Sequence, residues 1–251
     1  MPVISMIPSA ARRLLLAACA GLLLVGCASI PQGAQRDARD PMERFNRSVY
    51  VFNDKLDRAV ARPVARGYVK VVPQPMRTGV SNFFANLGYP TTVVNGLLQG
   101  KPVQFTSDLG RFLVNSTIGI GGLFDPATRM GLQSHDEDFG QTMAKWGMPS
   151  GPFLMLPVLG PSTLRDTAGD VADIYTSPKH YINNDWVRYG LYVPELIDKR
   201  AQLLTVESLQ NDVYDPYSFM RNAWLQRREY LIRDGNVEDD DVEIDFGEDE
   251  D

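Results

Sequence analysis

The chain contains very few cysteines and histidines, and this excludes several kinds of site. Its 251 residues include two of each. Cys19 lies within an expected N-terminal signal and Cys27 is the residue that we expect to be acylated, so no thiol remains for a disulfide or a cysteine metal site. His135 and His180 are too few for a multi-histidine metal site. The G-x-S-x-G, H-E-x-x-H and G-K-[ST] patterns of hydrolases, metalloproteases and phosphate loops are absent as well.

Residues 1–26 are typical of a bacterial lipoprotein signal peptide. Arg12 and Arg13 precede an apolar run over residues 14–25, which is shorter than the ~20 residues that a spanning helix needs. The run ends in Leu-Val-Gly before Cys27, a pattern that predicts cleavage there and diacylation of the cysteine sulfur, and two acyl chains form a stable anchor. Ala28 favours transport to the outer membrane. We therefore expect residues 27–39 to form a lipidated tether and the protein to face the periplasm.

The charge is distributed unevenly along the chain. Residues 236–251 hold ten acidic residues and no basic one, which predicts a disordered acidic tail. Without this tail and the predicted signal, the body has 23 basic and 21 acidic residues. A body so close to neutral is not that of a nucleic-acid-binding protein.

Apolar residues at spacings of three and four predict a chain built mainly of amphipathic helices. The first begins with Asp40 as its cap, Pro41 in its first turn and Glu43 closing a capping box, and Pro63 interrupts it. Further helices are expected at 75–87, 91–99, from 102 onward, after Asp138, and over 162–173, 184–204 and 215–235. The prolines around 152–157 disfavour both helix and central strand. One mainly α domain is expected over residues 40–235.

The apolar faces of these helices have two interpretations. They pack into an ordinary soluble core, or some of them lie in the plane of a membrane with aromatic residues at the level of the headgroups. Trp146, Trp186 and Trp224 are the candidate interface residues under the second interpretation. The predicted lipid anchor favours that interpretation because it holds the chain at a bilayer surface.

Several ordered motifs resemble those of the MlaA/VacJ lipoproteins, and the similarity extends from about residue 40 to residue 233. The acidic tail lies outside it. The matching segments are residues 40–50 (DPMERFNRSVY), 72–77 (VPQPMR), 81–83 (SNF), 111–125 (RFLVNSTIGIGGLFD), 139–142 (FGQT), 151–157 (GPFLMLP), 160–166 (GPSTLRD), 215–217 (DPY) and 226–230 (QRREY).

The resemblance implies a single ring-shaped domain of amphipathic helices that lie in the inner leaflet of the outer membrane and surround a polar channel. Such proteins sit beside a porin trimer and remove mislocalised phospholipids from the outer leaflet. They pass the lipid to a periplasmic carrier protein of the MlaC type for retrograde transport, which maintains lipid asymmetry. No cofactor and no catalytic activity are implied.

Two groups of residues are candidates for such a conduit, because a charged headgroup needs a polar path through hydrocarbon. Phe52, Asn53 and Asn115 are predicted to face it. Three glycines in the following loop are predicted to let that loop act as a gate. They are Gly119, Gly121 and Gly122. The alternative is that the asparagines are satisfied structural groups and the glycines only turn the chain.

Two other classes of function stay open at this point. Ser134, His135 and Asp136 are the residue types of a nucleophile triad, but adjacent residues do not reach one another as a triad requires. An enzyme, for example a phospholipase, would therefore need a partner group from elsewhere in the fold. A structural lipoprotein that associates with porin without transporting lipid would share the anchor and the helices.

Overall fold

The computed structural model describes residues 37–210 and 214–236. Cys27, the predicted signal peptide, most of the predicted tether and residues 237–251 of the acidic tail lie outside the described residues. The lipidation and the disorder of the tail therefore stay predictions.

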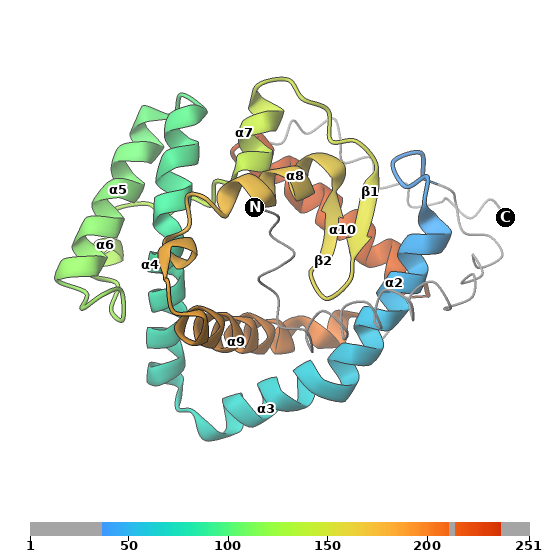
Figure 1. The fold of residues 1–251 in the computed structure, drawn as a ribbon, viewed down its shortest axis with the longest axis horizontal. Helices are drawn as coiled ribbons and strands as arrows, with labels where there is room; N and C mark the ends of the chain where they lie inside the picture. Colours follow the sequence, from blue (N-terminus) through green and yellow to red (C-terminus); the bar gives the residue numbers. More distant parts are fainter. Residues whose placement is uncertain (1–36, 211–213, 237–251) are drawn as a thin grey trace, which may run out of the picture.

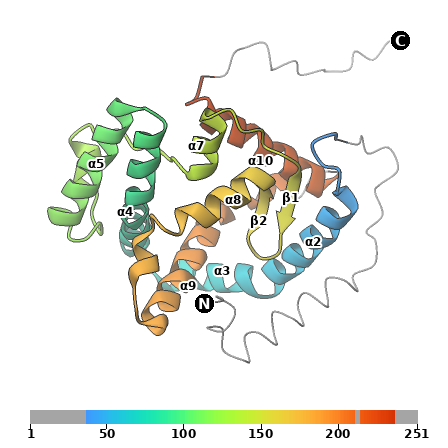
Figure 2. The ribbon, with the colours of Figure 1, turned by 45° about the horizontal axis from the view of Figure 1, so that its top comes forward.

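The described part is mainly helical, as predicted, with one β-hairpin. Figure 1 shows the elements arranged in a ring, with α5 and α6 outside it beside α4. Helix α9 packs against α3 and α4, as the second view in Figure 2 shows. The elements are α2 (Glu43–Leu56), the π-helix η2 (Asp57–Ala61), α3 (Arg62–Val71), α4 (Gln74–Leu98), α5 (Pro102–Thr117), α6 (Pro126–Arg129), α7 (Phe139–Lys145), β1 (Phe153–Leu156), β2 (Gly160–Thr163), α8 (Leu164–Asp173), the 3-10 helix η3 (Pro178–Tyr181), α9 (Asp185–Gln202), the 3-10 helix η4 (Leu203–Gln210) and α10 (Pro216–Ile232).

Two prolines do not end helices where the sequence predicted that they would. The expected break at residues 88–90 is absent, since α4 continues through Pro90. Tyr89 and Thr92 on either side are buried, so tertiary packing offsets the backbone hydrogen bond that Pro90 lacks. Pro63 lies in the first turn of α3, directly after the π-turn η2. The wider π-turn accommodates the ring of Pro63, so the helical path continues from α2 into α3.

The predicted capping box at Asp40 is wrong. Helix α2 begins at Glu43 without a side-chain cap, and Glu43 binds Arg47 instead. The Asp40 carboxylate is fully buried and accepts hydrogen bonds from Asn46 and from Tyr217 on α10. Because these distant groups occupy its oxygens, Asp40 joins the start of the domain to the last helix rather than capping its own helix.

Other helix starts follow their local signals. The carboxylate of Asp138 accepts from Gln141 N at the start of α7, and Asn184 caps α9 in the same way. Asp215 caps α10. Helix α8 is capped by Thr163, one position after Ser162, where the predicted helix begins and which belongs to β2.

The sequence did not predict the β1–β2 hairpin. Phe153 pairs with Thr163 and Leu156 with Gly160 in antiparallel register. The prolines at 152 and 157 flank β1 and do not interrupt its ladder, and a two-stranded sheet has no central strand, so their presence is compatible with pairing.

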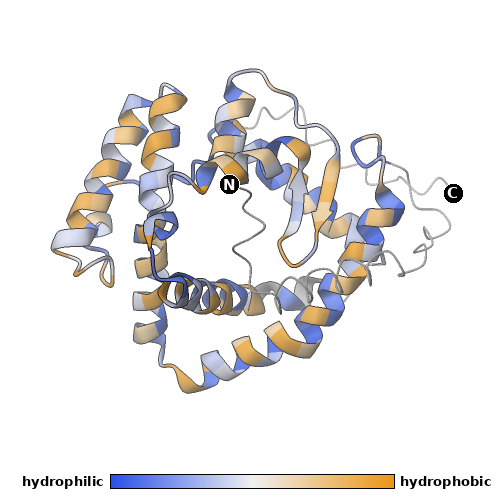
Figure 3. Ribbon diagram, viewed as in Figure 1, coloured by the Kyte–Doolittle hydropathy of each residue, from blue (hydrophilic) through white to orange (hydrophobic). Residues whose placement is uncertain are grey.

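Buried hydrophobic residues form only a small cluster, made of Val49, Phe153, Met155 and Tyr217, with Trp224 packed against it. Buried polar and charged residues outnumber buried hydrophobic ones in the described part, while large hydrophobic side chains are exposed along most helices. Figure 3 shows this alternation of hydrophobic and hydrophilic residues around the ring. Among the described residues, no helix has the length and hydrophobicity that crossing a bilayer requires.

Candidate functional site

The predicted conduit residues on α2 lie next to the β-hairpin. The Asn53 carboxamide donates to Leu156 O at 2.9 Å and accepts from Val158 N at 2.8 Å. It therefore fixes the turn that joins β1 to β2. Phe52, the neighbouring residue on α2, is half-buried.

Asn46, two turns before Asn53, holds the other end of β1. Its amide nitrogen donates to Phe153 O at 3.0 Å, and its oxygen accepts from Met155 N at 2.9 Å. The two asparagines thus replace the hydrogen bonds that a third strand would supply to β1, and their spacing along α2 matches the strand that they hold.

The third predicted residue, Asn115, is buried near the end of α5. It donates to Asp125 Oδ1 at 3.0 Å and accepts from Ala127 N at 3.1 Å. Asp125 also binds Arg111 at 2.7 Å, and Arg111 donates to the hydroxyl of Tyr89 on α4. Asn115 therefore anchors the far end of the glycine loop to the α4–α5 pair.

The glycine loop, residues 118–125, is tightly packed. A Cβ on Gly119 would lie 2.4 Å from the carbonyl oxygens of Asn115 and Phe124. Gly122 has φ +91°, and a Cβ there would lie 2.4 Å from that of Asn86. Gly121 also has positive φ but faces open space. Asn115 and the three glycines therefore belong to one region at the end of α5, while Phe52 and Asn53 belong to another, on α2 beside the hairpin.

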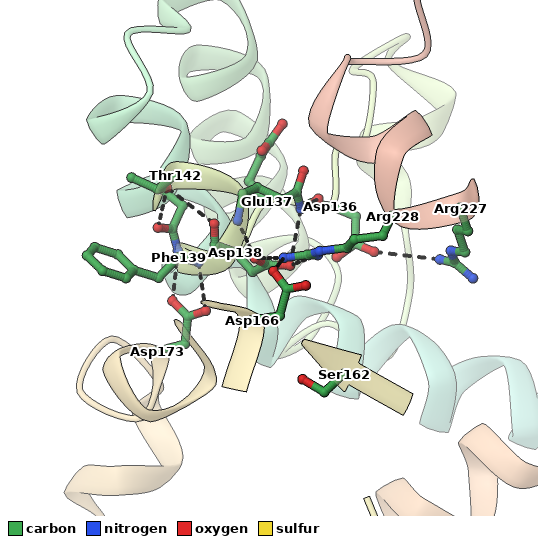
Figure 4. A network of polar contacts seen from close by, with 12 residues as sticks. Asp136, Glu137, Asp138, Phe139, Thr142, Ser162, Asp166, Asp173, Arg227 and Arg228 are labelled. Atoms are coloured by element: carbon green, nitrogen blue, oxygen red, sulfur yellow. Dashed lines mark hydrogen bonds and ion pairs between the residues drawn. The ribbon is translucent and has the colours of Figure 1, made fainter. Parts of the chain in front are cut away.

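A polar network that the sequence did not predict joins α7, α8 and α10 (Figure 4). Arg228 on α10 donates to both oxygens of Asp138, and at 2.8 Å to Asp166 Oδ1. Asp173 accepts from Phe139 N at 2.8 Å. Asp170 is exposed at the surface, yet its pKa is raised to about 6 by the surrounding protein, which weakens the solvation of its carboxylate, and by the nearby carboxylates of Asp138 and Asp173.

Close packing of α7 against α8 makes this network possible. A Cβ on Gly169 would lie 2.4 Å from the backbone nitrogen of Gly140, so only glycine permits this approach. The network residues Asp138, Asp166 and Arg228 come from separate parts of the sequence. Asp166 and Arg228 belong to matching motifs, and Asp138 directly precedes one, which is the signal by which they could have been found.

Ser134, His135 and Asp136, the residues considered for a nucleophile triad, each bind a different partner. The Ser134 hydroxyl bonds that of Tyr89 at 2.9 Å, whereas His135 Nδ1 lies 2.9 Å from the buried carboxylate of Asp108. Asp136 lies 3.8 Å from Arg227. Each of the three adjacent side chains thus has its own partner. The described ranges contain no group of His, Cys, Asp and Glu able to hold a metal ion.

Similar proteins are known. The family described as "MlaA lipoprotein" matches residues 38–231. The chain is 39% identical over 221 residues to the "Intermembrane phospholipid transport system lipoprotein MlaA" of Escherichia coli (strain K12), which covers 86% of each chain. The protein of the same name from Haemophilus influenzae is 30% identical, over 90% of this chain and 92% of that protein.

The fold has a solved counterpart. A structure reported under "Structural basis for maintenance of bacterial outer membrane lipid asymmetry" superimposes with a TM-score of 0.71 at 38% sequence identity, covering 78% of this chain and all of the other. The agreement of family, relatives and fold extends across the described helices, and the chain belongs to the MlaA lipoprotein family.

Proposed function

We propose that this chain is an outer-membrane lipoprotein that removes mislocalised phospholipids from the outer leaflet and passes them to a periplasmic carrier of the MlaC type. The observation that carries the proposal is its identity of 39%, over most of both chains, to a lipoprotein named for intermembrane phospholipid transport. No bond is broken in this activity.

The distribution of polar and apolar side chains supports a ring in the inner leaflet. Large hydrophobic side chains such as Val71, Val103 and Trp186 are strongly exposed, and contact with acyl chains would remove them from water. The buried positions are largely polar. In this proposal the exposed apolar side chains contact the acyl chains, and polar groups of the ring provide the path that a charged headgroup needs to cross hydrocarbon. The outer-membrane porin trimer is the proposed partner at the outer side of the ring.

Phe52, Asn53 and Asn115 are proposed to border the conduit. Both asparagines use their amides to hold loops, so in this proposal they set the shape of the path rather than offering free polar groups. Gly119, Gly121 and Gly122 are proposed to let the glycine loop gate the path. Gly121 is the position that tests this, because it has open space around it.

The test is the phospholipid content of the outer leaflet in cells that lack this chain, with and without complementation by the wild type. Accumulation on the outer face that complementation clears is the expected result. An unchanged outer leaflet would contradict transport and favour the alternative, a structural lipoprotein that associates with porin without moving lipid.

A further inference from the structure

A cavity of about 390 Å³ lies beside α10 and the start of α8, on elements other than those that carry the conduit residues. Three arginines contribute to its walls, namely Arg39, Arg165 and Arg228, together with the carboxylate of Glu229. None of these side chains has a role in the conduit proposed above.

Arg165 is buried but poorly paired. Its side chain is only 6% exposed, yet its three hydrogen bonds are all 3.3 Å long, two to Asp166 Oδ1 and one to Met148 O. Arg47, which is buried to a similar degree, binds Asp215 at 2.6 and 2.8 Å. Leaving the donors of a buried guanidinium group poorly satisfied costs free energy.

The acceptor that Arg165 shares is already in use. Asp166 Oδ1 accepts from Arg228 at 2.8 Å, and Asp166 Oδ2 accepts from Thr163 Oγ1 at 2.7 Å. In addition, the Nε of Arg228 is buried and has no acceptor among the described residues. The guanidinium groups of Arg165 and Arg228 therefore have more donors than there are well-placed acceptors beside the cavity. This indicates that an oxyanion of a ligand accepts the remaining hydrogen bonds.

The remaining walls restrict what that ligand is. The planar fork of an arginine fits two oxygens of a phosphate. Leu225 and Ile232, about two turns apart on α10, add an apolar wall that suits methylene groups. Glu229 is 55% exposed, with Oε1 bound to Arg233, and supplies negative charge for a cation. Since Asp138 and Asp166 offset much of the positive charge, the cavity suits a zwitterion better than a multiply charged anion.

We propose that this cavity binds the headgroup of a zwitterionic phospholipid, with Arg165 on the phosphodiester and Glu229 on the ammonium group. The inference rests on the proposed function, since it places a headgroup-binding site on the same ring but apart from the conduit residues. Lipid that has reached α10 is held there by its headgroup.

The first test is calorimetric titration of the full lipidated protein in detergent micelles with glycerophosphoethanolamine. Wild type binds, and Arg165→Gln weakens binding at least tenfold. Arg227→Gln is the matched control, because Arg227 adjoins Arg228 on α10 but is 71% exposed and does not line the cavity. It changes the affinity less than twofold. Absence of binding by the wild type, or equal affinities of wild type and Arg165→Gln, overturns the proposal.

A second arm separates a lipid headgroup from free phosphate. Inorganic phosphate binds at least fivefold more weakly than glycerophosphoethanolamine, because it lacks the ammonium and the methylene groups. Glu229→Gln removes most of that preference. Equal binding of the two probes by the wild type shows a general oxyanion site and overturns the assignment to a headgroup.

A third measurement distinguishes a binding role of Arg165 from a structural one. Arg165→Met removes a poorly paired buried charge, so the melting temperature stays the same or rises while the probe no longer binds. A fall of several degrees assigns Arg165 to the fold and overturns the proposal.

If wild type clears outer-leaflet phospholipid in cells but does not bind the probe, only the cavity proposal fails. If it binds the probe but does not clear lipid, the transport function fails instead.

Discussion

Arg47 and Asp215 form a two-point ion pair that joins the first and last helices of the ring. Arg47 Nη1 and Nη2 donate to the two carboxylate oxygens of Asp215 at 2.8 and 2.6 Å, and Nε of the same guanidinium donates to Glu43 at 2.8 Å. Both side chains are largely buried. Since Asp215 also caps α10, one carboxylate sets the start of that helix and its attachment to α2.

Asp215→Ala is expected to destabilise the domain strongly. It leaves the guanidinium of Arg47 buried with one fewer partner, which typically costs about 3–5 kcal/mol, and it removes a helix cap worth about 1 kcal/mol. Urea unfolding of the detergent-solubilised protein measures the change. Asp54→Ala is the control, since its ion pair with Arg58 is exposed and worth less than about 1 kcal/mol. Similar losses in both variants would contradict the role assigned to Asp215.

The same pair predicts a dependence of stability on acid. The hydrogen bond from Arg47 lowers the pKa of Asp215 from 3.8 to about 2. A carboxylate whose pKa is lower in the folded state stabilises that state fully above its ordinary pKa, and this contribution disappears as the pH falls toward the folded value. We expect stability to fall between about pH 4 and pH 2, with a shallower fall in Asp215→Asn. Asp37, also lowered to about 2 by Arg39, contributes in the same window. Identical pH profiles of wild type and Asp215→Asn would be inconsistent with this assignment.

Asn53→Ala is expected to loosen the β-hairpin locally. It removes the acceptor for Val158 N and the donor to Leu156 O, and because both hydrogen bonds are at least partly open to solvent, each contributes about 0.5–1.5 kcal/mol. Hydrogen exchange measured by mass spectrometry reports the change as faster exchange at the β1–β2 turn. Peptides from α5 serve as the internal control. Unchanged protection of the turn would mean that Asn53 does not hold it.

Two glycine substitutions separate gating from folding. Gly122→Ala places a Cβ against Asn86 at a strained φ, so a loss of stability above about 2 kcal/mol is expected. In Gly121→Ala the added Cβ contacts no neighbour, and stability falls only by the strain of holding alanine in the left-handed conformation, about 1 kcal/mol. Gly121→Ala is therefore the variant for the flux measurement, and altered clearance of outer-leaflet phospholipid is expected at normal protein levels. Unchanged clearance by this folded variant would rule out the gating proposal.

The features that the sequence predicted are those fixed by neighbouring residues. The predicted helix starts near Asp138, Asn184 and Asp215 are set by side chains that bind backbone groups two or three residues away, so a short stretch of sequence is enough to predict them. Pro90 and Asp40 were misjudged because distant contacts decide both: packing around Tyr89 keeps α4 intact, and Tyr217 takes the carboxylate of Asp40. The β-hairpin was missed because two short strands flanked by prolines carry little periodicity.

Local sequence patterns could not predict the polar network of α7, α8 and α10, because its contacts also join residues that are far apart in the sequence. Arg228 and Asp138 lie 90 positions apart, and neither stands out in its own segment. Asn53 and Asn115 were predicted to face a conduit, and spacing alone does not show that their amides bind the hairpin and the glycine loop. Contacts between residues so far apart can be predicted from a sequence only where motifs shared with related chains mark the residues involved.

His135→Ala tests the remaining enzymatic alternative. His135 Nδ1 and backbone N both contact the carboxylate of Asp108, which is almost fully buried. Burial raises the pKa of Asp108 and the contacts from His135 oppose that rise, so loss of the imidazole raises the pKa further and destabilises the fold by about 1–3 kcal/mol. A transporter tolerates this loss, so complementation with His135→Ala should still clear outer-leaflet phospholipid. Release of fatty acid by purified wild type, abolished in a stably folded His135→Ala protein, would instead establish a hydrolase in which Asp108 orients His135 as the base.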